Sequence, residues 1–415
     1  MPGAETPMDE AAQVAPPPGA SGVAGVGGMF DPRFRSVVGA FAETVGEPQS
    51  AGAALSVWYR GVEVVNVWRG VADSRDSRPW RGRTAAVLFS ATKGLAALVI
   101  AVLAEQGRIN LDAPVADVWP EFRVHGKGSL TVGDLLAHRA GLIAPDVNLE
   151  LADVLDSRRF AARLAAQKPA WTPGEAHMYH AITWGPLVRE LVLRATGQDL
   201  PELFRELIAA PLQADATLKA TDAEVSRVAH VSTSPTWDAW SVQVTDMIGE
   251  DGLRFLTAGG ALPVGLVTAD GGLNDPRVLK AGLVSASGIA TASALARIWS
   301  SAVVPTLGHR LLSEGGTALL TRERSGGPSA TDNSSTGPFQ RWGAGVQLSS
   351  DALPWLTEAS FGHDGAGGQA GFADPHYQVG FGYLTNRMEV TSQVGQIVSA
   401  LRAVLDAGER AEPAV

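Results

Sequence analysis

Residues 88–122 read LFSATKGLAALVIAVLAEQGRINLDAPVADVWPEF, and this stretch decides how the chain is expected to fold. The apolar, strand-like run Ala85–Phe89 leads into Ser90, and a long apolar helix follows from Gly94. A helix that is apolar on nearly all sides is expected to be buried, so this one should be the central helix of its domain. Gly107 is well placed to end it.

Ser90 and Lys93 form a Ser-x-x-Lys pair at the start of this helix. Residues three apart lie on the same helix face, so the Lys93 amine is expected to approach Ser90 Oγ. Burial disfavours the charged form of an amine, which lowers its pKa and lets it accept a proton from serine. The bare pattern is weak evidence, and the surrounding sequence has to support it.

Several further segments occur in the order typical of one family. They are GSLTVGDLLAHRAGL at 128–142, Trp171–Gly174 followed by Tyr179, Gly343–Leu348, and GFGYLTNR at 380–387. With residues 88–122, they make the chain similar to the serine β-lactamase and penicillin-binding-protein-like superfamily, in its class C branch. Within that branch the chain most resembles the family VIII carboxylesterases, over roughly residues 36–406.

The order of expected elements predicts an α/β fold of the α+β type, in which an antiparallel sheet is flanked by helices and carries an inserted, mostly helical domain. We expect a hairpin at 53–59 and 62–68, a helix at 201–208, loops at 232–276, a helix at 292–302, strands at 343–348, 369–373 and 378–385, and a last helix at 394–405.

The same pattern suggests domain boundaries. Residues 1–28 are expected to be a flexible N-terminal tail, 29–110 and 277–410 one α/β domain, 111–276 the inserted helical domain, and 411–415 a C-terminal tail. The active site is expected in the groove between the two domains.

By resemblance, Tyr179 begins the family's second motif, and its oxygen should lie beside Ser90 and Lys93. A phenol becomes a usable base only when a cation or donor stabilises its anion, and Lys93 could supply that. We therefore expect Tyr179 to be the general base in both steps, although the pair would titrate as one unit and either residue could hold the proton. The alternative is a core tyrosine that is hydrogen-bonded at its tip.

The third and second motifs depart from those of penicillin-recognising relatives. The chain has His363-Asp364-Gly365 where they carry Lys-Thr-Gly, and Ala181 where they carry asparagine. In those relatives the lost groups hold the substrate carboxylate and the amide side chain. An anionic peptide or β-lactam should therefore bind poorly, whereas a simple ester needs neither contact.

The strand position after Gly365 is Ala366, whose backbone N–H, by resemblance, pairs with that of Ser90 to form the oxyanion hole. Each such donor contributes about 3 kcal/mol to the transition state. Glycines around it let the substrate approach closely.

His363 is a candidate for orienting the leaving group or Tyr179, and a strand histidine bonded to a neighbour is an equal alternative. Trp237 and Trp240 could line an apolar acyl or alcohol pocket, while the chain's tryptophans are mostly expected in the core.

Composition excludes several function classes. A net charge of −10 without a basic run disfavours a nucleic-acid or anionic-membrane partner, and the absence of cysteine excludes disulfides and a thiol nucleophile. No Gly-x-Ser-x-Gly motif occurs, and Gly365–Ala370 fits a dinucleotide fingerprint only loosely, since a strand rather than a helix is expected after it. His177 and His180 lack a further ligand set, so neither a metal nor another cofactor is expected.

Four functions remain open. The first is a serine carboxylesterase on short-chain or aryl esters, acting through an acyl-Ser90 intermediate on a small-molecule ester. The second is an acyltransferase using the same acyl-enzyme, the third a weak β-lactamase or D-amino-acid peptidase, and the fourth an inactive binding protein. Residues 1–28 lack the basic start of a secretory signal, so we expect a cytoplasmic location. The oligomeric state cannot be predicted.

Overall fold

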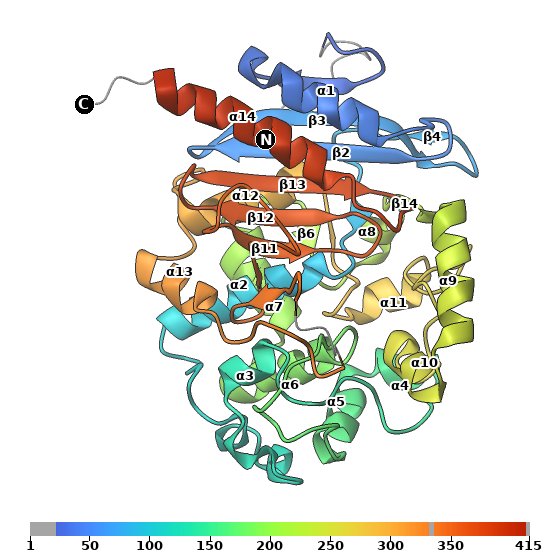
Figure 1. Cartoon of the computed structure of the whole chain (residues 1–415), viewed down its shortest axis with the longest axis vertical. Coiled ribbons are helices and arrows are strands. Elements are labelled where there is room, and N and C mark those ends of the chain that lie inside the picture. The colour runs from blue at the N-terminus through green and yellow to red at the C-terminus, as the bar shows by residue number, and fades with distance from the viewer. Residues whose placement is uncertain (1–21, 332–335, 412–415) are drawn as a thin grey trace, which may run out of the picture.

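The central element is an antiparallel sheet with strand order β1-β3-β2-β13-β12-β11-β10-β9, and β4 pairs with β3 (Figure 1). This computed structural model describes residues 22–331 and 336–411. The strands are β1 (Gly27–Phe30), β2 (Gly52–Tyr59), β3 (Val62–Asp73), β4 (Arg78–Pro79), β9 (Arg341–Trp342), β10 (Gln347–Leu348), β11 (Phe361–Asp364), β12 (Ala370–Asp374) and β13 (Val379–Thr385). The N-terminal hairpin pairs directly with β13, so both ends of the chain build one sheet and the predicted fold class is confirmed.

Helices cover both faces of this sheet. On one face, α1 (Arg35–Thr44) packs beside α14 (Val394–Ala411) on an apolar layer of β2, β3 and β13 (Figure 1). On the other lie α12 (Ala292–Val303) and the buried α2 (Ala91–Glu105). α12 comes so close that a Cβ at Gly380 would lie 2.2 Å from the Ser300 amide nitrogen, so β13 needs glycine there.

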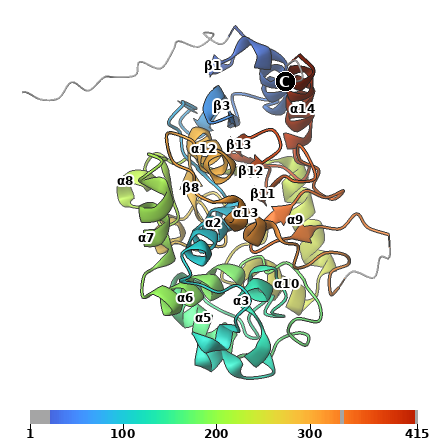
Figure 2. The same ribbon diagram turned by 90° about the vertical axis from the view of Figure 1, so that its left-hand side faces the viewer.

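The remaining helices gather mainly below the sheet in Figure 1 and are seen from the side in Figure 2. They are α3 (Val132–Leu136), α4 (Leu151–Leu155), α5 (Ser157–Ala166), α6 (Trp184–Thr196), α7 (Leu200–Phe204) continuing as a π-helix (Arg205–Ala209), α8 (Asp222–Val225), α9 (Pro235–Met247), α10 (Glu250–Thr257), α11 (Pro276–Ala281) and α13 (Glu314–Thr321). None of the helices in the described ranges could cross a bilayer. The domain division and the cytoplasmic location stay predictions.

The prediction of loops throughout 232–276 is wrong, because α9 and α10 lie within it. Ser234 caps α9 by accepting a hydrogen bond from the Trp237 amide, and Pro235 occupies the first helical position. Both are ordinary helix-start signals that the abundance of Trp, Gly and Pro obscured.

The predicted strand at 343–348 is also wrong, since those residues form a tight turn and only the short strand β10. Gly345 has φ +84°, and the Gly343 amide donates to Val346 O, so the chain reverses between β9 and β10. At the N-terminus, β1 starts at Gly27, so two residues assigned to the tail belong to the sheet. At the C-terminus, α14 extends to Ala411, so that residue belongs to the helix rather than to the predicted tail. Residues 1–21 and 412–415 of the predicted tails lie outside the described residues.

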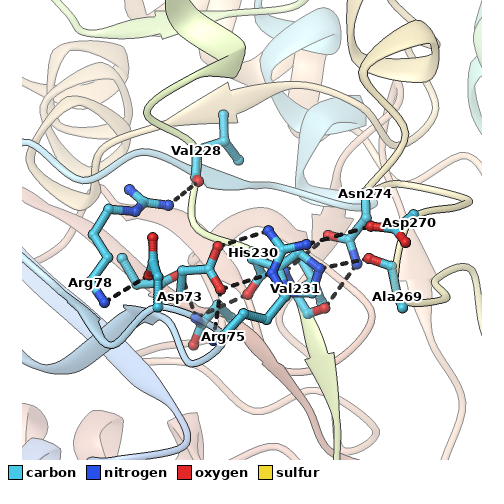
Figure 3. A network of polar contacts seen from close by, with 12 residues as sticks. Asp73, Arg75, Arg78, Val228, His230, Val231, Ala269, Asp270 and Asn274 are labelled. Atoms are coloured by element: carbon cyan, nitrogen blue, oxygen red, sulfur yellow. Dashed lines mark hydrogen bonds and ion pairs between the residues drawn. The ribbon is translucent and has the colours of Figure 1, made fainter.

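A polar network ties the segment before α9 to the sheet (Figure 3). Arg75 forms an ion pair with Asp73 at the end of β3, and also contacts Asp270. The His230 ring contacts Ala269 O at 2.7 Å, and Asn274 exchanges hydrogen bonds with the backbone of residue 231. Three short strands, β5 (Ala86–Val87), β6 (Ala216–Thr217) and β8 (Ile289–Ala290), make a second antiparallel sheet, and β7 (Ser232–Thr233) pairs with β14 (Arg387–Met388).

Candidate active site

Ser90 lies at the junction of β5 and α2, as the N-cap residue of the helix rather than inside its first turn. The preceding residue, Phe89, takes φ +47°, a conformation that is unfavourable for a bulky L-residue. Strain of this kind persists where surrounding contacts fix it, and it clusters at functional sites. Here the Leu88 amide donates to Gly288 O at 2.8 Å and the Thr92 amide to Phe89 O at 3.0 Å.

Lys93 is completely buried, and its amine has three oxygen partners. Nζ lies 3.2 Å from Ser90 Oγ, 2.8 Å from Ala181 O and 2.8 Å from Ser285 O. Burial lowers the pKa of Lys93 well below its usual value, and the Asp364 carboxylate offsets only part of this shift. A neutral amine has two N–H bonds for the two carbonyls and a lone pair left for the serine hydroxyl.

Tyr179 packs directly beside this pair. Lys93 Nζ lies 4.9 Å from the centre of its ring, and the Trp342 ring stacks on it at 5.3 Å and 18°. The Tyr179 hydroxyl is buried and has no hydrogen-bond partner of normal geometry among the described residues. Burial raises its pKa above the usual range, and the Ser90 hydroxyl, which lies close by, reduces this rise only in part.

Two buried histidines hold the backbone on both sides of Tyr179. His138 O accepts from the Met178 amide at 3.2 Å, and His138 Nδ1 accepts from the His180 amide at 3.2 Å. The His138 ring also meets the Tyr179 ring edge-on at 4.8 Å. His180 Nε2 accepts from the Leu142 amide at 3.1 Å, so its Nδ1–H donates to Met178 O at 2.7 Å. Burial lowers the pKa of both rings, to about 4 for His180, and keeps them neutral.

His363 lies near the end of β11, and the centre of its ring is 6.1 Å from that of the Tyr179 ring. Its Nδ1–H donates to Asp364 O at 2.7 Å, which leaves the lone pair on Nε2. Nε2 is buried without a hydrogen-bond partner among the described residues, and burial lowers the pKa of His363 to about 3. His363 therefore faces Tyr179 as a neutral acceptor.

Asp364 differs from these groups because 44% of its side chain is exposed. Gln347 holds it twice: Nε2 donates to Asp364 Oδ1 at 2.8 Å, and Oε1 accepts from the Asp364 amide at 2.7 Å. Partial burial raises the pKa of Asp364, while the hydrogen bond from Gln347 and the Lys93 amine lower it.

The turn after β11 packs on the backbone before Ser90. A Cβ at Gly365 would lie 2.4 Å from Leu88 O, so this approach requires glycine. Across residues 22–331 and 336–411, the Ser90 and Ala366 amides have no hydrogen-bond acceptor. Both donors are therefore available to a substrate oxygen.

The two tryptophans expected to line a substrate pocket, Trp237 and Trp240, lie in α9. Trp237 is buried in the first turn of α9, and its ring lies 4.9 Å from that of half-buried Trp240. The Ser234 amide before them donates to Met388 O, and Met388 Sδ would lie 2.4 Å from a Cβ at Gly367. The start of α9 is thus next to the turn that carries Ala366, but no contact of either tryptophan with Ser90 or Tyr179 is seen in the described parts of the chain.

A cavity of about 180 Å³ adjoins this turn at Gly367 and Gly368. Its other lining residues include Glu47, Tyr383 and Arg387, and Ser90 is not among them. This cavity is therefore separate from the candidate site at Ser90.

Sequence reasoning missed several residues of the site. These are Trp342, His138, Ser285 and Gln347. Trp342 was expected in the core, and it does pack there while stacking on Tyr179. The missed residues act through ring contacts or backbone atoms, which a short motif does not reveal. His138 and Gln347 had a signal, since they stand in the quoted segments 128–142 and 343–348.

Known proteins share this fold and chain organisation. The family model "Beta-lactamase" matches residues 37–403, so the chain belongs to the beta-lactamase family. The esterase/beta-lactamase LipL of Mycobacterium tuberculosis is 36% identical over 369 residues, which cover 87% of this chain and 83% of that protein. The crystal structure of a family VIII carboxylesterase is 32% identical, with a TM-score of 0.79 over 91% of this chain and 99% of that one.

A second solved structure, EstA from Arthrobacter nitroguajacolicus Rue61a, is also 32% identical, with a TM-score of 0.78 over 91% of this chain and 98% of that one. The predicted family resemblance is confirmed.

Proposed function

We propose that the protein is a serine carboxylesterase that hydrolyses small esters, with short acyl chains or aryl leaving groups, through an acyl-Ser90 intermediate. The observation that carries the proposal is the 3.2 Å contact between Ser90 Oγ and the amine of completely buried Lys93. Membership of the beta-lactamase family and the similarity to proteins named esterases support the same reaction class.

In acylation, Ser90 Oγ attacks the ester carbonyl carbon while its proton moves to the lone pair of Lys93. The pKa directions favour this order, because burial keeps the amine neutral and opposes a tyrosinate. This assignment differs from the expectation that Tyr179 is the first base. Tyr179 then relays a proton to the leaving oxygen as the bond from that oxygen to the carbonyl carbon breaks.

In deacylation, water attacks the acyl carbon and gives a proton to the same two residues. The bond from that carbon to Ser90 Oγ then breaks, the two residues return a proton to Ser90 Oγ, and the acid leaves. The Ser90 and Ala366 amides would hold the oxyanion in both steps.

Two alternatives are less well supported. A β-lactamase or D-amino-acid peptidase would need groups that hold a substrate carboxylate, and a half-exposed Asp364 stands at that place in the motif. An acyltransferase would use the same acyl-enzyme and differ only in whether an alcohol or water accepts the acyl group.

Intact-mass spectrometry after mixing with p-nitrophenyl acetate or butyrate tests the proposal. We expect an acyl adduct on the wild-type protein and none on Ser90→Ala, with p-nitrophenol released only by the former. Adding a primary alcohol during turnover separates hydrolysis from transfer, since a transferase would form the new ester. Turnover by Ser90→Ala at the wild-type rate would refute the proposal.

A further inference from the structure

The half-exposed side chain of Asp364 has no role in the ester reaction above. Its neighbours His363, Lys93 and Tyr179 are buried or act in proton transfer, whereas 44% of the Asp364 side chain is open to solvent. A substrate can therefore reach this carboxylate.

The charge of Asp364 has no fixed counterion. Among the described residues, no lysine or arginine comes within ion-pair distance of the Asp364 carboxylate. The titratable side chain that does is His363, whose Nδ1 lies 3.8 Å from Asp364 Oδ1. That ring is neutral, because burial lowers the pKa of His363 to about 3. The undescribed stretches 1–21, 332–335 and 412–415 contain no lysine or arginine.

Lys93 does not neutralise this charge either. Its amine is hydrogen-bonded to Ser90 Oγ and two backbone carbonyls rather than to Asp364, and burial lowers its pKa and so favours the uncharged form. Gln347 meanwhile fixes the Asp364 carboxylate through Oδ1 and the residue's own amide, so the negative charge is held in place. A charge that is already positioned costs a ligand less ordering entropy.

The position of Asp364 also indicates which part of an ester it meets. Asp364 Oδ1 lies 3.8 Å from the His363 ring, whose centre is 6.1 Å from that of Tyr179, so Asp364 is on the side of the site from which Tyr179 would pass a proton to the leaving oxygen. The leaving group must lie on that side, and the acyl chain extends away from the carbonyl carbon in another direction.

We propose, resting on the esterase function above, that Asp364 selects esters whose leaving alcohol or thiol carries a cationic group, and disfavours anionic ones. The reaction itself is unchanged: the Ser90 Oγ–acyl bond forms, the bond to the leaving atom breaks, and the serine proton ends on that atom. Asp364 contributes attraction to the ammonium group before and during this step.

The test uses three thioesters of the same acyl group that differ in the charge of the thiol. They are acetylthiocholine, its neutral isostere S-(3,3-dimethylbutyl) thioacetate, and S-acetyl-3-mercaptopropionate. Thiol release can be followed with Ellman's reagent without background from the enzyme, because the chain contains no cysteine. We expect kcat/KM about tenfold higher for the cation than for the neutral isostere, and about tenfold lower for the anion.

Asp364→Asn keeps an acceptor for Gln347 and removes the charge, so it should bring the cation-to-neutral ratio close to one, mainly through KM. Asp251→Asn is the matched control, because Asp251 is 99% exposed on α10 and its loss changes the net charge equally. It should leave the ratio as in the wild type.

A wild-type cation-to-neutral ratio near one or below would overturn the inference even if Asp364→Asn did not fold. A tenfold ratio that Asp364→Asn retained would overturn it as well. If the wild type released no thiol from any of the three and formed no acyl-Ser90, the esterase function itself would have failed.

Discussion

The two sides of the site differ in their contact with water. Around Lys93, the polar groups other than Ser90 are buried: the lysine is inaccessible, His138 and His363 are neutral, and the Tyr179 hydroxyl has no hydrogen-bond partner of normal geometry among the described residues. Around Asp364, the side chain is half-exposed, and Gln347 donates a hydrogen bond to its carboxylate.

This contrast indicates a division of roles. Burial shifts the pKa values on which proton transfer depends, and it works only where water is excluded. Selection of a substrate requires the opposite, a group that a ligand can reach. Changes on the buried side should therefore act on kcat, and changes on the exposed side on KM and on specificity.

The largest effect on the buried side is expected from Ser90→Ala. Removing a covalent nucleophile generally costs several orders of magnitude, so kcat for p-nitrophenyl butyrate should fall at least about a thousandfold. The thermal midpoint should hardly move, because the hydroxyl is only half-buried and bonded to one group. A variant that kept more than about a thousandth of the wild-type kcat would exclude Ser90 as the nucleophile.

Lys93→Met and Tyr179→Phe should each lower kcat by about 10² to 10⁴, the usual contribution of acid–base groups. The double variant should lose much less than the product of the two losses, because both residues serve one proton-transfer unit. Lys93→Met should melt at the wild-type temperature or above, since it removes a buried amine without an ion-pair partner. Multiplicative losses in the double variant would mean that the two residues act independently.

Gly365→Ala and Ala366→Ser test the oxyanion donors as a matched pair. A Cβ at Gly365 would collide with Leu88 O, so the turn must shift and misplace the Ala366 amide, with an expected loss of about a hundredfold in kcat. Ala366→Ser keeps the backbone donor and should stay within about threefold of wild type. Equal rates for the two variants would place the oxyanion hole elsewhere.

The buried side was more predictable from the sequence than the exposed side. Ser90 and Lys93 are three apart on one helix, so helix geometry alone predicts their contact. Tyr179 is brought to them by tertiary packing, and only the family resemblance indicated it. Its supports, His138 and Trp342, act through ring and backbone contacts that no short motif encodes.

The fold shows the same limit. Strands with clear alternation and the start of the last helix are predicted near their observed bounds, because periodicity reports which face is buried. That helix continues to Ala411 rather than ending at residue 405. Helix α9 was missed, since it buries only Trp237 and so has little apolar periodicity. The turn at 343–346 was read as strand because apolar residues flank glycines whose conformation decides the structure.

The variants His138→Leu and His138→Asn test whether the hydrogen bond from the His180 amide to His138 positions the Tyr179 phenol. Leucine cannot accept the hydrogen bond from the His180 amide, so kcat should fall about tenfold with little change in KM. Asparagine places an oxygen near the position of Nδ1 and tolerates the φ of +65° at this residue, so it should restore kcat to within about threefold. Rates are compared per acylated Ser90, so that unfolded protein does not contribute. Equal kcat values for both variants would reduce His138 to a core residue.

The smallest effect should link the exposed side to the buried one. Asp364 is faced by Gln347, His363, Lys93 and Tyr179, and its charge raises the pKa of Lys93 against the larger lowering by burial. Lys93 must be neutral to accept the serine proton, so activity is lost as the pH falls through the pKa of Lys93.

Asp364→Asn removes the charge that favours the ammonium form, which lowers the pKa of Lys93 further. The acid limb of the kcat/KM profile for a neutral ester should therefore move to lower pH, while kcat/KM on the plateau changes by less than about threefold, since water screens a half-exposed charge. Asp251→Asn should leave the limb in place. A shift of the limb to higher pH would mean that the group titrating there is not Lys93, and that the buried side does not respond to the exposed one through charge.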